Sequence, residues 1–375
     1  MIAYVGIDAH TTNYTLATRM EGSKEPINVN TYSPAVSNIV KYCKAIRKEY
    51  GKDTEIVLGY EAGCLGFKLR RDLEQNDLKC IILAPTSIPG TEQNRKRKKK
   101  TDKRDAEAIA KALINSDYSE VYMPDEEDEA VRDYIRMRED HRKQLRVIKQ
   151  QISALTNRHG FKFTEGKNYW TQKHLKWLKG LPIEGIGKET IDSYLLSYET
   201  VSDRIAQMDK KIEEIAEQDR YREAVHRLIC FKGVKTLTAL AVIVEIGDFT
   251  RFVKAKNFAA FLGLVSGELS SSDDQNRLPI TKQGNRFIRK LLVECSQSFS
   301  KATSGKSALL KKRQEGNTAE VIIYADKANE RLRKRYLTLI LRNKKPHNKA
   351  VTAVARELAC FIWGMMTGNI HTALA

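Results

Sequence analysis

The sequence predicts an α/β N-terminal domain with a mixed sheet, then a long-helix, coiled-coil-like region and a mainly α-helical C-terminal domain. Short apolar runs alternate with helical segments up to about residue 124, whereas later apolar residues recur every three or four positions. A chain of 375 residues is also too long for one small domain. We therefore expect domains at 1–124, 125–224 and 225–375.

The first domain is expected to open with a β-hairpin. The apolar run 2–7 ends at Asp8, and β-forming residues alternate over 13–18. Further strands are predicted at 55–62, 79–85 and 121–124, and helices at 35–50, from Gly66 through Leu73, and from about Asp102 behind a Thr101 cap. This alternation indicates a layered α/β sheet.

The central region is expected to contain two long amphipathic helices. Apolar stripes run through 125–159 and 191–215. They suit either an antiparallel hairpin or a dimerising coiled coil. The connector 160–182 interleaves aromatic residues with lysines, a composition that suits RNA or single-strand contact or a small local core.

The C-terminal region is predicted to be helical around one polar loop. Residues 228–252 look like a helix-hairpin-helix element whose turn amides would meet a phosphate. A polar loop is expected at 266–285, then helices at 286–297, 325–341 and 347–366, the last too interrupted to span a membrane. The candidate phosphate contacts are Lys235, Lys282, Arg286 and Arg289.

The charge balance indicates a polyanionic partner. The chain has 65 Lys and Arg against 47 Asp and Glu, a formal charge of +18. With no long apolar segment or secretory signal, nucleic acid is a better partner than a membrane. The densest basic run is a candidate phosphate-binding segment, formed by Arg95, Lys96, Arg97, Lys98, Lys99 and Lys100.

The six cysteines indicate a reduced, cytoplasmic protein. They are scattered, with no CxxC or Cys/His ligand spacing, so we expect core thiols and no zinc site.

Four carboxylates are the candidate catalytic residues. Asp8 and Glu61 each close an apolar run, and Asp102 and Asp105 lie three residues apart at a predicted helix start. Each alone could be a turn residue, a cap or a salt-bridged surface acid. Together they match the layout of a ribonuclease-H-like nuclease, whose oxygen ligands hold Mg²⁺ or Mn²⁺.

The motifs GIDAH, GYEAG and TDKRDAEAIA, taken with FLGLVSGELSSSDDQNRLPITKQGNRFIRKLL, resemble one family over nearly the whole chain. It comprises the insertion-sequence transposases with a DEDD quartet, of the IS-one-ten type, described as bridge-RNA-guided recombinases. The resemblance implies a RuvC-like N-terminal domain in which Asp8, Glu61, Asp102 and Asp105 bind metal. It also implies a nucleophilic serine after the Gly-Leu motif, at Ser271.

This chain departs from the family pattern around that serine. Ser266 stands where the pattern has Pro, and Ser272 where it has Gly, so Ser270 or Ser272 could replace Ser271. The resemblance further implies DNA ends and targets, a guide RNA, and a homo-oligomer growing from dimer to tetramer on DNA, in a prokaryotic, nucleoid-associated setting. It assigns no role to residues 301–349.

Two other functions fit the residues. A junction-resolving nuclease would keep the sheet and the acids but use water as the nucleophile. A noncatalytic RNA/DNA-binding scaffold would use the carboxylates structurally. A covalent protein–DNA adduct distinguishes the transposase from both.

Overall fold

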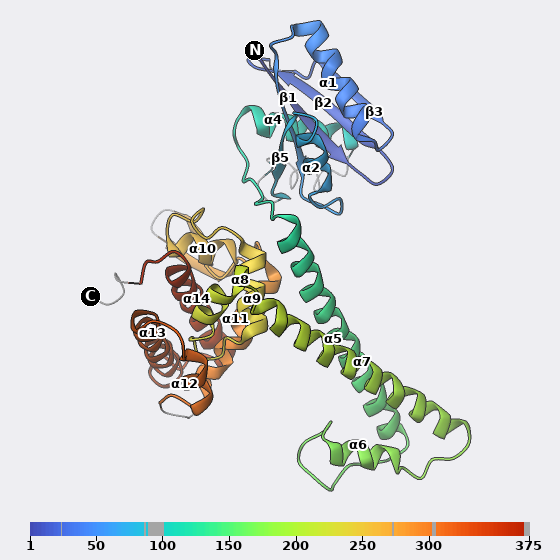
Figure 1. Cartoon of the computed structure of the whole chain (residues 1–375), viewed down its shortest axis with the longest axis vertical. Coiled ribbons are helices and arrows are strands. Elements are labelled where there is room, and N and C mark those ends of the chain that lie inside the picture. The colour runs from blue at the N-terminus through green and yellow to red at the C-terminus, as the bar shows by residue number, and fades with distance from the viewer. Residues whose placement is uncertain (24, 86–87, 89–100, 272–273, 302–304, 371–375) are drawn as a thin grey trace. The chain divides into compact units, whose positions relative to one another are not determined.

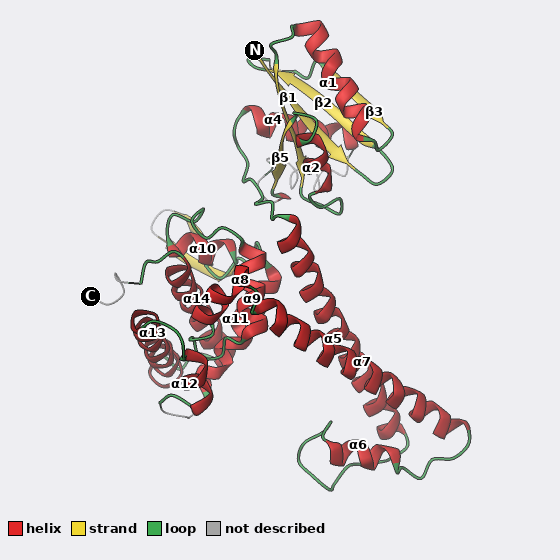
Figure 2. Ribbon diagram, viewed as in Figure 1, coloured by secondary structure: helices red, strands yellow, loops and turns green. Residues whose placement is uncertain are grey.

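The computed structural model describes residues 1–375 except 24, 86–87, 89–100, 272–273, 302–304 and 371–375. The chain divides into two compact units, Met1–Met123 and Pro124–Ala375. Figures 1 and 2 show that the first combines strands with helices and that the second is built mainly from helices. The expected mixed-sheet N-terminal domain and mainly helical remainder are confirmed.

The first unit contains a five-stranded sheet in the order β3-β2-β1-β4-β5. The strands are β1 (Ile2–Ala9), β2 (Tyr14–Met20), β3 (Asn28–Tyr32), β4 (Glu55–Glu61) and β5 (Lys79–Leu83). Strands β1, β2 and β3 pair antiparallel, whereas β4 lies parallel to both β1 and β5. Because β1 and β4 are adjacent and parallel, Asp8 and Glu61 lie at the same edge of the sheet.

Helices cover both faces of this sheet. Helices α1 (Val36–Tyr50) and α2 (Lys68–Glu74) pack on the face that carries Val5 and Ile7. Helix α4 (Asp102–Ile114) packs on the opposite face, against Val57 and Leu83. Alternating side chains of each strand thus enter two separate apolar layers.

Two predictions for this unit are wrong in detail. Strand β3 was not expected, because Asn is uncommon in strands, yet it pairs with β2 and Thr31 Oγ1 lies 3.0 Å from Thr15 Oγ1. The strand expected at 121–124 is absent from this part of the described chain. In its place the chain makes an isolated bridge between Leu83 and Glu120 and a 2.8 Å hydrogen bond from Val121 N to Ile82 O. The pairing does not continue to residue 124, because Pro124 has no N–H to donate to a strand.

The second unit consists mainly of helices, with one β-hairpin. Its elements are α5 (Glu126–Arg158), α6 (Gln172–Lys179), α7 (Ile186–Ala216), α8 (Asp219–Leu228), α9 (Thr236–Ile246), α10 (Ala255–Phe261), β6 (Ser266–Ser271), β7 (Asp274–Ile280), α11 (Arg286–Ser296), η2 (Gln297–Ser300), α12 (Ala308–Gln314), α13 (Ala319–Leu337), η3 (Thr338–Arg342) and α14 (His347–Met366). Its largest apolar core includes α9, most of whose residues are buried, and the buried face of α14.

Helices α5 and α7 form an antiparallel hairpin within one chain (Figure 1). Near the helical body, Ile135 and Ile212 share one core, while Ile152 and Ile191 share a second core at the far end. Between these cores, Arg138 donates two hydrogen bonds, of 2.8 and 3.0 Å, to the carboxylate of Asp209. The apolar stripes are therefore used in intramolecular packing.

The sequence prediction was wrong about the polar loop at 266–285, which contains the antiparallel hairpin β6–β7. Ser, Asn and Asp favour turns, but two strands that satisfy each other's backbone groups outweigh that preference. The helix expected at 325–341 also begins earlier, because Thr318 caps α13 by accepting from Val321 N at 3.5 Å. It ends in one π-helical turn, η3.

The cysteines are free thiols, four of them buried. Cys360 is half-buried, and Cys64 is exposed, so Cys64 is an exception to the expected core placement. Among the described residues, no helix has the length and apolar character that crossing a membrane requires.

Candidate active site on the N-terminal sheet

Asp8 lies near the carboxyl end of β1, the central strand of the sheet. Ile7 pairs with Tyr60, so Asp8 and Glu61 are the next residues on neighbouring parallel strands. Because side chains alternate along a strand, Asp8 shares its face with Gly6, the face covered by α4. This edge is where parallel sheets commonly place functional side chains.

The close approach of α4 to β1 depends on Gly6. A Cβ atom at Gly6 would lie 2.1 Å from Ala106 O and 2.5 Å from Ala110 N, so no larger residue fits without moving the helix. Small residues on both sides thus let the helix backbone rest on the strand. This packing brings the first turn of α4, with Asp102 and Asp105, to the edge that carries Asp8.

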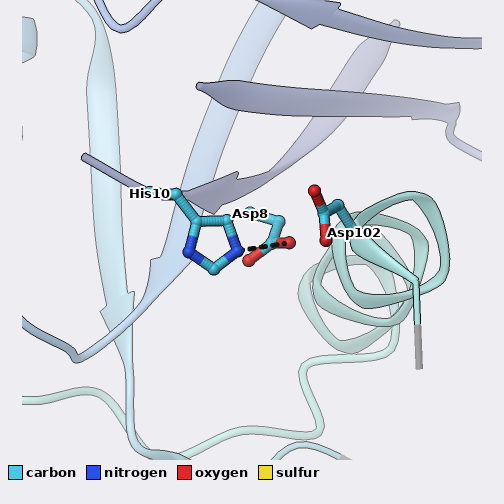
Figure 3. Close-up of side chains that lie close together, drawn as sticks. All are labelled: Asp8, His10 and Asp102. Carbon is cyan, nitrogen blue, oxygen red and sulfur yellow. Dashed lines mark ion pairs between the residues drawn. The ribbon is translucent and has the colours of Figure 1, made fainter. Parts of the chain in front are cut away.

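The structure brings Asp8, His10 and Asp102 together. One ligand atom from each lies within 4.8 Å of the others, and His10 Nε2 lies 3.3 Å from Asp8 Oδ2 (Figure 3). Asp102 extends from the start of α4 toward Asp8. Two carboxylates and one imidazole could therefore contact a single bound cation.

The environment of Asp8 disfavours its negative charge. Burial raises the pKa of the Asp8 carboxyl; His10 counteracts this, and the charges of Asp105 and Asp102 raise it further. Asp8 Oδ2 is buried and accepts no hydrogen bond in the described structure, its contact with His10 being an ion pair of imperfect hydrogen-bond geometry. A buried carboxylate oxygen without a donor, beside other acids, is well suited to a divalent cation.

The remaining two acids lie outside the Asp8–His10–Asp102 cluster. Asp105 is half-buried one turn along α4, near enough for its charge to act on Asp8. Glu61 is exposed at the end of β4, and its carboxylate is not among the three clustered ligand atoms. The structure therefore unites two members of the predicted quartet and leaves two at its margin.

His10 is not among the site residues predicted from the sequence. The signal was present in GIDAH, because residues two apart on an extended strand share a face. The expected Thr101 cap is also incomplete: Thr101 stands at the N-cap with extended backbone, but its side chain makes no capping hydrogen bond.

The β6–β7 hairpin carries the candidate serines and is called the serine hairpin below. The chain segments on either side of it pack tightly together. Gly263 and Gly284 both have positive φ, and Cβ atoms there would lie 2.1 Å from Gln283 O and 1.7 Å from Phe261 O, respectively. Ser270 and Ser271 belong to the backbone of β6, and Ser271 pairs with Asp274. The structure describes neither the side chains of Ser270 and Ser271 nor any part of Ser272.

Asn285, directly after the Gln-Gly turn, joins three helices. Its Oδ1 accepts a 3.0 Å hydrogen bond from Ile288 N and so caps α11. Its Nδ2 donates at 2.8 Å to Glu245 of α9, whose side chain is buried and receives two further hydrogen bonds from Arg136 of α5. No local sequence pattern predicts this cluster, because its members are remote in the chain.

The predicted phosphate contacts differ in their surroundings. Arg95, Lys96, Arg97, Lys98, Lys99 and Lys100 lie outside the described residues. Lys235 is exposed at the N-cap of α9, and Lys282 is exposed with φ of 56°. Arg289 donates to Leu262 O at 2.7 Å and to Gln283 O at 3.2 Å, so it braces the hairpin base. Arg286 is exposed at the start of α11.

The turn before α9 already has a protein partner. Lys232 N donates a 2.8 Å hydrogen bond to Asn329 Oδ1, and a Cβ at Gly233 would lie 2.3 Å from Cys295 O. One of the amides that the sequence interpretation assigned to phosphate is therefore used within the fold.

The aromatic residues of the connector pack together at the tip of the α5–α7 hairpin. His174 is buried, with ring-centroid distances of 4.9 Å to Phe163 and 5.2 Å to Trp170. Trp170 stacks on Tyr198 at 5.3 Å. These contacts make the connector a small local core.

Comparisons with known proteins identify related transposases. A family model described as "Transposase IS116/IS110/IS902 family" matches residues 225–311, and a second model, a transposase model of the DEDD IS110 type, matches residues 5–159. The transposase for insertion sequence element IS1533 of Leptospira borgpetersenii is 33% identical over 350 residues, covering 91% of this chain and 98% of that protein. The y4qE protein of Sinorhizobium fredii, also named as a transposase, is 31% identical over 97% of this chain and 88% of its own length.

A more distant relative is the transposase for insertion sequence element IS1111A of Coxiella burnetii, 25% identical over 72% of this chain and 67% of that protein. The matches cover both compact units, and transposases are enzymes that cut and join DNA. The chain therefore belongs to the IS110-type family of DEDD insertion-sequence transposases.

Proposed function

We propose that this transposase is a Mg²⁺- or Mn²⁺-dependent, RNA-guided recombinase that exchanges DNA strands through a serine–DNA intermediate. In this proposal residues 1–124 form a RuvC-like catalytic domain, 125–224 a helical coiled-coil region and 225–375 the domain that carries the serine. The observation that carries the metal assignment is the buried Oδ2 of Asp8, which lies 3.3 Å from His10 Nε2 and close to the carboxylate of Asp102.

The proposed metal ligands are Asp8, Glu61, Asp102 and Asp105, with His10 as an additional candidate. Oxygen ligands are what Mg²⁺ and Mn²⁺ prefer. Burial raises the pKa of Asp8, and the nearby charges of Asp105 and Asp102 raise it further, so a bound cation would favour the ionised carboxylate. When bound, a divalent cation would offset the negative charge that builds up on a phosphodiester under attack.

Ser271 is the proposed nucleophile. Its Oγ would attack a DNA phosphorus, forming a serine–phosphate ester while the bond from phosphorus to one deoxyribose oxygen breaks. The serine proton is lost to water, and the departing oxygen takes up a proton. One phosphoester replaces another, so a hydroxyl of a second strand can reverse the step on a new partner without an energy-supplying cofactor.

Nucleic acid would be recognised mainly through its backbone. The formal charge of +18 supports this, and a guide RNA paired with DNA would supply the sequence choice. The proposed assembly is a dimer that becomes a tetramer on DNA, so that two DNA ends can be processed together.

The test is a denaturing-gel assay for a covalent protein–DNA adduct, with insertion-sequence end DNA, the RNA transcribed from its flank, and Mg²⁺. We expect the wild type to form an adduct that Asp102→Ala and Ser271→Ala abolish. Ser270→Ala and Ser272→Ala are matched controls that should keep it, and loss in one of them instead would move the nucleophile to that position. Cleavage that needs Asp102 but survives without adduct in all three serine variants would make water the nucleophile.

Metal binding has a readout that is independent of activity. Mg²⁺ at about one hundred times its Kd should stabilise the wild type by ~2.7 kcal/mol. Asp102→Asn should lose most of this stabilisation in thermal unfolding, whereas Asp117→Asn, beyond the C-terminal end of α4, should keep it. Equal shifts in both variants would remove Asp102 from the ligand set.

A further inference from the structure

A cleft of about 720 Å³ lies between α5 and α11 in the second unit, outside the carboxylate cluster. Six basic residues and two acids line it, together with Leu145 and Phe287, which leaves four net positive charges. The charged residues are Glu139, Arg142, Lys143, Arg146, Lys149, Arg286, Lys290 and Glu294. Of these residues, Arg286 alone was predicted from the sequence to contact phosphate.

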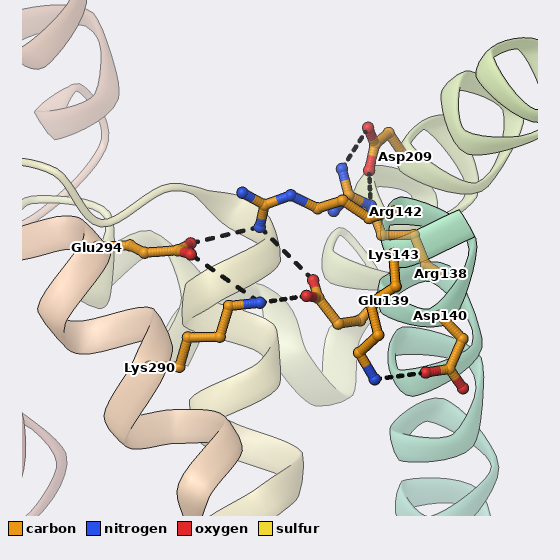
Figure 4. Close-up of polar contacts among 8 residues, drawn as sticks. All are labelled: Arg138, Glu139, Asp140, Arg142, Lys143, Asp209, Lys290 and Glu294. Atoms are coloured by element: carbon orange, nitrogen blue, oxygen red, sulfur yellow. Dashed lines mark hydrogen bonds and ion pairs between the residues drawn. The ribbon is translucent and has the colours of Figure 1, made fainter. Parts of the chain in front are cut away.

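The two acids of the cleft hold the helices together. Glu139, whose side chain is largely buried, pairs with Lys290 and lies 3.6 Å from Arg142. Arg142 in turn lies 3.4 Å from Glu294 of α11 (Figure 4). These ion pairs tie α5 to α11 and fix Arg142 and Lys290 on the cleft wall.

Of the other cations of the cleft, Lys143 pairs with Asp140 at 2.7 Å, whereas Arg146, Arg286 and Lys149 have no anionic partner among the described residues. Arg146 and Arg286 are exposed, and neither makes a hydrogen bond or an ion pair with the described residues. Lys149 lies 5.2 Å from the ring centre of Trp170, and its burial lowers its pKa. A cleft that gathers unpaired positive charge is a site for an anion.

The spacing of these cations fits a chain of phosphates better than a single one. Arg142, Arg146 and Lys149 recur every three or four residues of α5, a row of roughly 10 Å at 1.5 Å per residue. On α11, Arg286 and Lys290 are four residues apart. A B-form strand carries a phosphate about every 3.4 Å, so this row spans about three nucleotides.

We propose that this cleft binds the sugar–phosphate backbone of DNA beside the serine hairpin. Arg286 directly follows Asn285, which caps α11 at the base of that hairpin, so the cleft begins where the hairpin ends. The assignment of DNA rests on the proposed attack by a serine of that hairpin, because the attacked strand must be held next to it. Arg146, Arg286 and Lys149 contact phosphate, while Glu139 and Glu294 keep Arg142 and Lys290 oriented.

The test compares full-length Arg146→Ala/Arg286→Ala with wild type in binding duplex insertion-sequence end DNA across a salt series. Losing two phosphate contacts should weaken binding about tenfold near 0.15 M salt and reduce the slope of log K against log salt by roughly 1.8. Arg146→Lys/Arg286→Lys should restore the slope, because it keeps both charges. The matched control is Lys41→Ala/Lys44→Ala on α1, two exposed cations of the other unit, on the sheet face opposite α4.

Unchanged DNA binding by the alanine pair, or an equal loss in the α1 control, would overturn the proposal. The RNA transcribed from the flank is titrated in parallel, and a loss confined to RNA would make RNA the occupant and also overturn it. Thermal unfolding should be unaltered, since neither arginine has a hydrogen-bond or ion-pair partner in the part of the chain that the structure describes. A wild type that binds DNA through Arg146 and Arg286 yet never forms an adduct would refute the serine mechanism and leave the cleft assignment standing.

Discussion

At the scale of single residues, one amide orders the region around the serine hairpin. Asn285 caps α11 and also donates to Glu245, a buried acid held by Arg136. A buried carboxylate that loses a donor retains its desolvation cost, so removing Asn285 affects more than a cap. Asn285 therefore couples the start of α11 to α9 and α5.

Replacing Asn285 should cost more than replacing an ordinary cap. Asn285→Ala loses a cap and a hydrogen bond to a buried carboxylate, so we expect the free energy of unfolding to fall by about 2–3 kcal/mol. Ser307→Ala is the control, because Ser307 caps α12 through a single 3.2 Å bond, a contribution of about 1 kcal/mol. Urea denaturation measures both, and similar losses would mean that the bond to Glu245 adds nothing.

At the scale of elements, the contact between β1 and α4 determines the geometry of the acidic site. Ala106 and Ala110 rest on Gly6, and the helix start above them carries Asp102 and Asp105. Because packed interiors transmit small displacements, a methyl group added under the helix would move the acids as well as strain the core.

Gly6→Ala should destabilise the protein by about 3 kcal/mol or more, because its Cβ meets backbone atoms that cannot rotate away. Any folded fraction should also show a reduced Mg²⁺-dependent rise in melting temperature. Gly63→Ala is the control, since its Cβ would meet nothing closer than Glu61 O at 3.7 Å. A Gly6→Ala protein as stable as this control would show that α4 can move at no cost.

The small core at the tip of the α5–α7 helical hairpin should lose stability in acid. Burial lowers the pKa of His174 below its ordinary 6.5, so the folded protein holds the neutral ring. As the pH falls below 6.5, His174 is protonated in the unfolded chain before it is protonated in the folded protein. The free energy of unfolding therefore decreases until the pH reaches the lowered pKa of the folded state. Tryptophan fluorescence of urea unfolding between pH 8 and pH 5 should show this loss in wild type and less of it in His174→Phe. Parallel profiles would exclude His174 as the cause.

At the scale of the whole molecule, the carboxylate cluster belongs to one compact unit and the serine hairpin to the other. If the carboxylate cluster and the serine act on the same phosphate, they come either from one chain or from two different subunits. Mixing inactive variants distinguishes these two possibilities.

Mixing two inactive variants should restore the covalent adduct. If the acids of one subunit serve the serine of another, Asp102→Ala and Ser271→Ala proteins together form mixed dimers with one intact site each. Random pairing gives roughly a quarter of the wild-type yield. The same gel assay reports it, with each variant alone as control. No recovery, together with a monomeric mass on DNA, would show that each chain supplies both parts.

Features that depend on local sequence pattern, such as strand ends, were predicted from the sequence. Features that depend on contacts between distant segments were not. Asp8 and Glu61 could be assigned to one sheet edge because each ends an apolar strand, and parallel strands align their ends. His10 was missed because the two-residue period of a strand was not applied to it. The Asn285–Glu245–Arg136 cluster was missed because its hydrogen-bonded partners lie up to 109 positions apart in the chain. The β6–β7 hairpin was missed because its polar side chains conceal backbone pairing.

The exposure of Cys64 offers an experimental handle. It lies three residues after Glu61, whereas the other five thiols are buried or half-buried, with pKa values that burial raises to about 12 for Cys43 and about 11 for Cys295. Since the thiolate is the reactive form, a maleimide dye near neutral pH should label Cys64 first. A fluorophore can therefore be attached at Cys64, close in sequence to Glu61, without any mutation. Its emission could report the binding of metal and DNA in real time.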